Sequence, residues 1–173
     1  MIKINKKFVL KGAVYALIYI FFIVLETNIF NGLKIFGAKP NLVISLCIAA
    51  SVLENERYGA SLGFVLGFIT DSAFGSPFLM SGIYYFFAAY IGGICAKLYF
   101  NKSVLTMIIL TAPVLGLRAV INLFFLAGTW QDFEIIKGLS EYILPEYIYS
   151  FALAPPVYIF IRQTAAKINY NNI

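Results

Sequence analysis

Apolar residues along this chain gather into six long runs, and short polar stretches separate each run from the next. A helix needs about 20 apolar residues to cross the roughly 30 Å hydrocarbon core of a bilayer. Strands of a membrane barrel would show short alternating segments instead, and lipid offers no partner to an unpaired backbone group. The runs therefore predict an all-α integral membrane protein, in which one domain (residues 1–173) forms a bundle of six transmembrane helices. The predicted spans are residues 8–25, 41–56, 58–74, 77–96, 103–127 and 142–161.

The second run is shorter than the others. Its apolar part, from Asn41 to Leu53, has 13 residues and reaches only about 20 Å as a helix. Little tilt, extension through Glu56 by snorkelling, or shelter by neighbouring helices would accommodate it. The alternative is a re-entrant hairpin from Asn41 to Phe74 together with four full spans.

The composition also indicates lipid exposure. Hydrophobic residues make up 61% of the chain and charged residues 12%, against about 45–50% and about 25% in soluble domains. So few charges cannot cover the surface of a soluble protein of this length. The 13 basic residues lie mainly between the apolar runs, as topology signals do, so we do not expect nucleic-acid binding. Cys47 and Cys95 lie inside apolar runs and are interpreted as packing residues.

Basic residues divide unequally between the two sides of the predicted membrane domain. Numbering the connections alternately puts nine on the side of the termini and three on the other, with Arg118 inside a span. Because cytoplasmic loops favour Lys and Arg, both termini are predicted to be cytoplasmic. No small-residue cleavage site follows Leu25, so the first span is predicted to be an uncleaved anchor and not a signal peptide. The nine are Lys3, Lys6, Lys7, Lys11, Arg57, Lys97, Lys102, Arg162 and Lys167, and the three are Lys34, Lys39 and Lys137.

The third span carries a glycine at every fourth position. Gly59, Gly63, Gly67 and then Asp71 follow one another at this spacing, which places all four on one face of a helix. Three glycines make a smooth ridge that another helix can approach closely. Two interpretations remain open at this point: packing within the bundle, or docking of a separate membrane protein.

Asp71 and Arg118 are the charges that lie well inside predicted spans. A charge in lipid is costly, so each is expected to have a partner. Counting from the same side of the membrane, both lie about 20 Å into their helices. We therefore predict an intramembrane Asp71–Arg118 ion pair, with a ligand-binding or proton-relay role, or snorkelling to the interface, as alternatives. Glu26 and Glu146, at the outer ends of two spans, could join the same polar layer.

Groups that would indicate catalysis are missing from the sequence. The chain contains no histidine, which is the usual base for a serine nucleophile, and no glycine is followed by lysine as in a phosphate-binding loop. Paired acidic residues occur as Glu54/Glu56 and Asp132/Glu134, which are expected to be exposed loop charges. We predict a protein without enzymatic activity, cofactor or metal site.

Pro155-Pro156 predicts a kink in the last span.

The central third of the chain carries an ordered set of motifs between Lys39 and Gly93. A Pro-Asn-Leu opening to a short span comes first, followed by a charged turn, a glycine-stepped helix that ends in Asp, and a Gly-Ser-Pro stretch. In this sequence these are Pro40-Asn41-Leu42, Glu54 to Arg57, Gly59 to Asp71, and Gly75-Ser76-Pro77. In this order and over these residues, the chain resembles the MreD family of rod shape-determining proteins.

The resemblance implies a function and a set of partners. Members of the family are non-enzymatic scaffolds of the bacterial cell-elongation complex in the cytoplasmic membrane, needed for rod shape and directed peptidoglycan synthesis. Implied partners are a bitopic protein similar to MreC, through it an MreB-like actin filament, and a RodA-type glycan polymerase with its class B penicillin-binding protein. The family fold is similar to the S components of energy-coupling-factor vitamin transporters. A substrate-binding transporter subunit is therefore the alternative function.

Overall fold

The computed structural model describes residues 6–26, 40–74, 80–99, 102–129 and 143–170. These residues form six α-helices and no strands, which confirms the predicted all-helical class. In chain order the helices are α1 (Lys6–Val24), α3 (Leu42–Leu53), α4 (Glu56–Phe74), α5 (Met80–Tyr99), α6 (Val104–Thr129) and α8 (Leu144–Tyr170).

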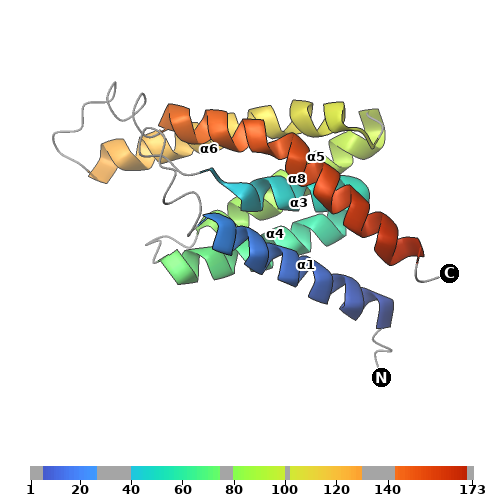
Figure 1. Cartoon of the computed structure of the whole chain (residues 1–173). Helices are drawn as coiled ribbons and strands as arrows, with labels where there is room; N and C mark the ends of the chain where they lie inside the picture. The colour runs from blue at the N-terminus through green and yellow to red at the C-terminus, as the bar shows by residue number, and fades with distance from the viewer. Residues whose placement is uncertain (1–5, 27–39, 75–79, 100–101, 130–142, 171–173) are drawn as a thin grey trace.

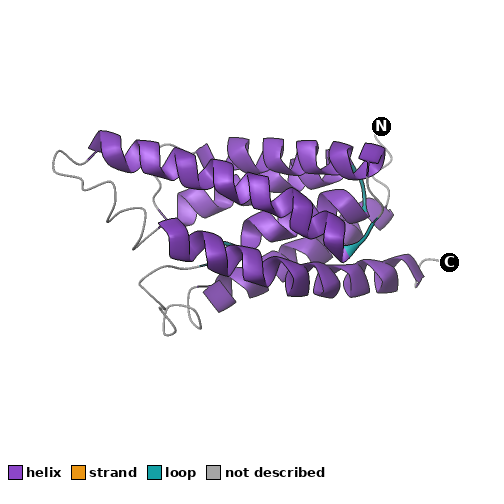
Figure 2. Ribbon diagram, turned by 90° about the horizontal axis from the view of Figure 1, so that it is seen from above, coloured by secondary structure: helices purple, strands orange, loops and turns teal. Residues whose placement is uncertain are grey.

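The helices run back and forth along one long direction of the bundle (Figures 1 and 2). As a result, the start of α1 and the end of α8 lie at the same end of the molecule, which we call the terminal end. The turn between α3 and α4 and the start of α6 also lie there (Figure 1). Among the described basic residues, Arg118 lies toward the opposite, distal end of α6. The others belong to the terminal end: Lys6, Lys7, Lys11, Arg57, Lys97, Lys102, Arg162 and Lys167.

α3 is the central helix of the bundle. It lies between α6 and α8 on one side and α1 and α4 on the other (Figure 1), and it contacts all five of the other described helices. Every residue from Leu42 to Val52 is buried. Its 12 residues make a helix about 18 Å long, so its neighbours shelter a segment that is too short to cross a bilayer by itself.

Both ends of α3 are closed by hydrogen bonds. Asn41 is the N-cap, and its side-chain oxygen accepts a bond of 3.0 Å from the N–H of Ile44, as expected of a residue that favours this position. At the other end the N–H of Glu54 bonds to the carbonyl of Ala50 at 3.0 Å. The helix therefore stops at Leu53, and the predicted extension through Glu56 is wrong because Glu56 already opens α4.

The remaining helix bounds follow the apolar runs with small shifts. α5 continues to Tyr99, and the predicted beginning of that span, residues 77–79, lies outside the described residues. α8 continues past Ile161 to Tyr170, because nothing in the polar sequence after Arg162 breaks a helix. Pro155 and Pro156 lie within α8, and Figure 1 shows this helix bending about halfway along its length.

The outer surface of the bundle is rich in large apolar side chains. Each of the five outer helices exposes several of them, for example Leu17 on α1 (66%), Leu105 on α6 (65%) and Ile91 on α5 (56%). By length and apolarity, Val104–Phe124 of α6 is the one stretch of described helix that can cross a membrane unaided. Lys11–Val24 and Leu42–Leu53 are also apolar but shorter.

Candidate functional site

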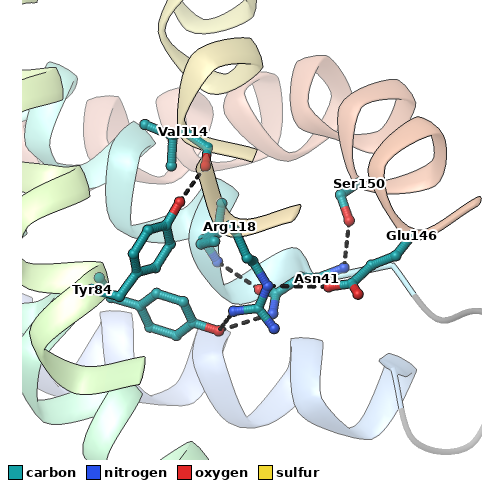
Figure 3. A network of polar contacts seen from close by, with 8 residues as sticks. Asn41, Tyr84, Val114, Arg118, Glu146 and Ser150 are labelled. Atoms are coloured by element: carbon teal, nitrogen blue, oxygen red, sulfur yellow. Dashed lines mark hydrogen bonds and ion pairs between the residues drawn. The ribbon is translucent and has the colours of Figure 1, made fainter. Parts of the chain in front are cut away.

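A network of polar side chains joins four helices toward the distal end of the bundle (Figure 3). Arg118 of α6 is at its centre. Its Nε donates to Oε1 of Glu146, in the first turn of α8, at 3.1 Å. A second guanidinium nitrogen donates to the hydroxyl of Tyr85 on α5, also at 3.1 Å, and the guanidinium carbon lies 5.8 Å from the centre of the Tyr85 ring. The arginine is thus bound on two sides.

Asn41 extends the same network to α3. Its side-chain nitrogen donates to the Tyr85 hydroxyl at 2.9 Å, and its backbone N–H donates to the Ser150 hydroxyl of α8 at 2.7 Å. The Tyr85 hydroxyl therefore accepts from both Asn41 and Arg118. Asn41 and Tyr85 are 7% and 1% exposed, so these bonds satisfy polar groups that water does not reach.

The network holds a partly shielded ion pair. The side chains of Arg118 and Glu146 are 21% and 26% exposed, so the pair is neither fully buried nor freely solvated. Among the described residues no cluster of three or more His, Cys, Asp or Glu residues could hold a metal ion. The network joins α3, α5, α6 and α8 at one point.

Asp71 has a different partner from the one predicted. The carboxylate is 3% exposed, and its Oδ2 accepts a bond of 2.8 Å from the N–H of Ser81, at the start of α5. The first N–H groups of a helix lack partners within it and attract negative charge. In the described structure Arg118 pairs with Glu146 and not with Asp71, so the predicted ion pair is replaced by a helix cap and a separate ion pair.

The glycine ridge of α4 is covered by neighbouring helices. A Cβ added to Gly63 would lie 2.6 Å from the carbonyl oxygen of Tyr85, and one added to Gly67 would lie 2.6 Å from Cα of Gly82. Both neighbours belong to α5, so the two backbones are in direct contact, as small residues permit in membrane bundles. Of the two interpretations, packing within the bundle describes the ridge in this structure.

The third glycine of the ridge faces α3. A Cβ on Gly59 would lie 2.3 Å from Cβ of Ser51, and one on Gly93 of α5 would lie 2.1 Å from the Ser51 hydroxyl. Ser51 is thus enclosed between α4 and α5, and its hydroxyl donates to the carbonyl of Ala89. Three helix backbones meet around one small side chain, which leaves no room for a larger residue at these positions.

Lysines hold the turn between α3 and α4 at the terminal end. Lys97 of α5 donates to Glu56 at 3.2 Å, and Lys102 donates to the carbonyl of Leu53 at 2.6 Å. Hydrogen bonds from its own backbone N–H and from Lys97 lower the pKa of Glu56 below its usual 4.5. Glu54 in turn pairs with Lys11 of α1 at 2.5 Å. Glu54 and Glu56, predicted to be exposed loop charges, are therefore partners of lysines from other helices.

Several residues of the network carry no recognisable signal in the sequence. Tyr85 and Ser150 are residue types that also occur at many lipid-facing or core positions, so neither can be recognised from the sequence. Tyr84, whose hydroxyl donates to the carbonyl of Val114 (Figure 3), cannot be told apart from its neighbour Tyr85 in the sequence. Tyr147 of α8 similarly donates to the carbonyl of Ala112 at 3.3 Å. Both carbonyls flank Pro113 in α6, so tyrosines from two helices bind the α6 backbone on either side of a proline.

The fold and the polar network together define an all-helical protein with an apolar exterior, joined internally by backbone contacts and buried hydrogen bonds. A family model described as rod shape-determining protein MreD matches residues 6–167. The chain belongs to the MreD family, and is therefore a membrane protein of a family that serves in rod shape determination. Membership implies association, in general terms, with the MreB/MreC shape-determining system. No curated protein and no solved structure gives a significant match.

Proposed function

We propose that this protein is a non-enzymatic, multi-pass scaffold of the bacterial cell-elongation complex. The observation that carries the proposal is the family match over residues 6–167. The exterior of the bundle supports the multi-pass arrangement, since all five outer helices expose large apolar side chains while α3 exposes none. Such a surface suits lipid and partner helices.

The proposed orientation places the terminal end in the cytoplasm. Eight described basic residues lie at that end, and cytoplasmic segments favour Lys and Arg. The two ends of α6 provide the test, because Lys102 and Gly128 are both exposed. In a chain lacking its two cysteines, Gly128→Cys should react with a membrane-impermeant thiol reagent in intact cells and Lys102→Cys should not. The opposite order would contradict the orientation.

Partners are proposed to meet the outward face of the α4–α5 hairpin. Since α3 and α5 cover the glycine ridge, a partner must use the side chains around it. Those side chains form a shallow apolar groove of ≈ 520 Å³. We assign it to a transmembrane helix of the elongation complex, either that of the MreC-like protein or one from the RodA-type polymerase and its class B penicillin-binding protein. The groove is lined by Ser61, Phe64, Val65, Ile83, Phe86 and Phe87.

Filling the groove tests this proposal. Val65 and Ile83 are 53% and 54% exposed, so tryptophan can be placed at both without entering the core. The double Trp variant should remain abundant in the membrane, lose copurification with those partners, and give widened, rounded cells. A matched double Trp variant at Leu117 and Val120 of α6, which are 57% and 64% exposed, should keep the partners and the rod shape.

Two results would count against the proposal. If the groove variant keeps every partner and normal shape, the α4–α5 face is not the docking surface. If deletion of the gene abolishes vitamin uptake in cells of unchanged shape, the scaffold function itself is wrong and a transporter subunit takes its place. No comparison supports that transporter alternative.

A further inference from the structure

The contact between α1 and the α3–α4 turn contains a carboxylate that is only half satisfied. Lys11 of α1 binds Oε2 of Glu54 at 2.5 Å, and the Glu54 side chain is 12% exposed. The other carboxylate oxygen, Oε1, is buried and receives no hydrogen bond from the described part of the chain. A charged oxygen removed from water without a donor is strongly unfavourable.

A second unsatisfied group lies in the same contact. Tyr15 follows Lys11 by one turn of α1, and Tyr58 follows Glu54 by one turn into α4. The rings of Tyr15 and Tyr58 meet edge to face with their centres 5.6 Å apart. Tyr15 is 1% exposed, and its hydroxyl has no hydrogen-bond partner among the residues that the structure describes. Glu54 also acts electrostatically on this hydroxyl.

The two contacts form successive rungs between the same elements. Lys11 with Glu54 is the first rung, and Tyr15 with Tyr58 is the second. The two rungs bring the Tyr15 hydroxyl and Glu54 Oε1 into the same contact between α1 and the α3–α4 turn. A group that satisfies both must be neutral, because Lys11 already balances the charge of Glu54, and it must donate a hydrogen bond to Oε1 while it donates to, or accepts from, the Tyr15 hydroxyl.

We propose that a buried water molecule bridges Oε1 of Glu54 and the hydroxyl of Tyr15, and so fastens α1 to the α3–α4 turn. Water satisfies both groups at once, and buried waters in proteins occupy sites of this kind, with two to four polar partners. A cation would add an unbalanced charge, and an apolar group would leave both oxygens without partners. The proposal does not depend on the protein's function.

Tyr19, two turns further than Lys11 along α1, offers a direct comparison. Its hydroxyl donates to the carbonyl of Leu66 at 3.1 Å and lies 2.9 Å from the Thr70 hydroxyl. Tyr19→Phe therefore removes a known bond and should lower the thermal unfolding midpoint by about 2–4 °C. If water bridges Tyr15 to Glu54, Tyr15→Phe should lower the midpoint similarly. If the Tyr15 hydroxyl is unpaired, the change should leave the midpoint unchanged or raise it, which overturns the proposal.

A second measurement separates the bridge from other effects of Tyr15. In a Glu54→Ala background, Tyr15→Phe should have little further effect, since the bridge has already lost one side. An equal effect in both backgrounds overturns the bridge. If Glu54→Ala fails to fold, an experimental structure of the unaltered protein at better than about 2 Å resolution tests the water bridge directly. Density for one water within about 3.2 Å of both oxygens is expected, and a direct Tyr15–Glu54 bond, or an empty contact, refutes it.

Discussion

Arg118 on α6 and Glu146 on α8 lie 3.1 Å apart, Nε to Oε1, and this ion pair joins the two helices toward the distal end of the bundle. The arginine also donates to the Tyr85 hydroxyl. Removing Glu146 therefore leaves a guanidinium that keeps one hydrogen bond but has lost the negative charge that balances it. Removing one member of a shielded pair costs more than removing both.

A double-mutant cycle on the free energy of unfolding should detect this coupling. Because both side chains are about a quarter exposed, we expect Arg118→Gln and Glu146→Gln to show a coupling energy of about 1–2 kcal/mol. The cycle of Arg118→Gln with Asp71→Asn is the control, and those changes should add within about 0.5 kcal/mol. Strong coupling to Asp71 and none to Glu146 would restore the ion pair predicted from sequence.

Asp71 should behave as a helix cap. Asparagine can accept the same hydrogen bond from the Ser81 N–H, so Asp71→Asn should cost little. Asp71→Ala leaves a buried donor without a partner and should cost about 1–3 kcal/mol. Chemical denaturation of both variants measures the difference. Equal, large losses from Asn and Ala would show that the negative charge, and not the capping bond, is what matters.

The glycine ridge should tolerate no side chain. Gly63→Ala and Gly67→Ala each place a Cβ 2.6 Å from the α5 backbone, so each should destabilise the protein by about 1–3 kcal/mol or more. Gly12→Ala on α1 is the matched control, because its Cβ meets nothing within 4 Å. That change should be neutral or stabilise by about 0.5–1 kcal/mol. Thermal unfolding in detergent compares all three, and equal effects would exclude close backbone packing of α4 on α5.

Two adjacent tyrosines should differ in importance. Tyr85→Phe removes the acceptor of both Arg118 and Asn41, so we expect a loss of about 2–4 kcal/mol in unfolding free energy. Tyr84→Phe removes a donor to the carbonyl of Val114, which lies within a helix, and should cost only about 1 kcal/mol. If Tyr84→Phe proves the more damaging change, the network is not centred where the structure places it.

The pH dependence of stability should report on Glu56. Its pKa in the folded protein is lowered below 4.5 by its backbone N–H and by Lys97. A lowered pKa stabilises the folded state above the usual value, and that contribution disappears as the pH falls through the lowered value. Stability should therefore decline below pH 4.5 less steeply in Glu56→Gln than in the unaltered protein. Between pH 5 and 7 the difference between the two should stay constant.

Helix class and helix position could be predicted from the sequence because they depend on local properties. The length of an apolar run and the polar residues at its two ends are enough to predict a helix. The spans predicted at residues 8–25 and 103–127 begin and end within about two residues of α1 and α6. The sequence also predicted that this helix approaches another helix closely, since the spacing puts Gly59, Gly63 and Gly67 on one face. It could not predict that α3 and α5 are the helices that pack against that face.

Only the tertiary structure decided which groups meet. Asp71 and Arg118 have similar calculated depths in their helices, but depth says nothing of lateral position, and each found a nearer partner in Ser81 and Glu146. The shortest apolar run became the centre of the bundle because five longer helices could surround it. Partner choice of this kind depends on how whole helices pack, and hydrogen bonds between residues as distant in the chain as Asn41 and Ser150 exist only once that packing is complete.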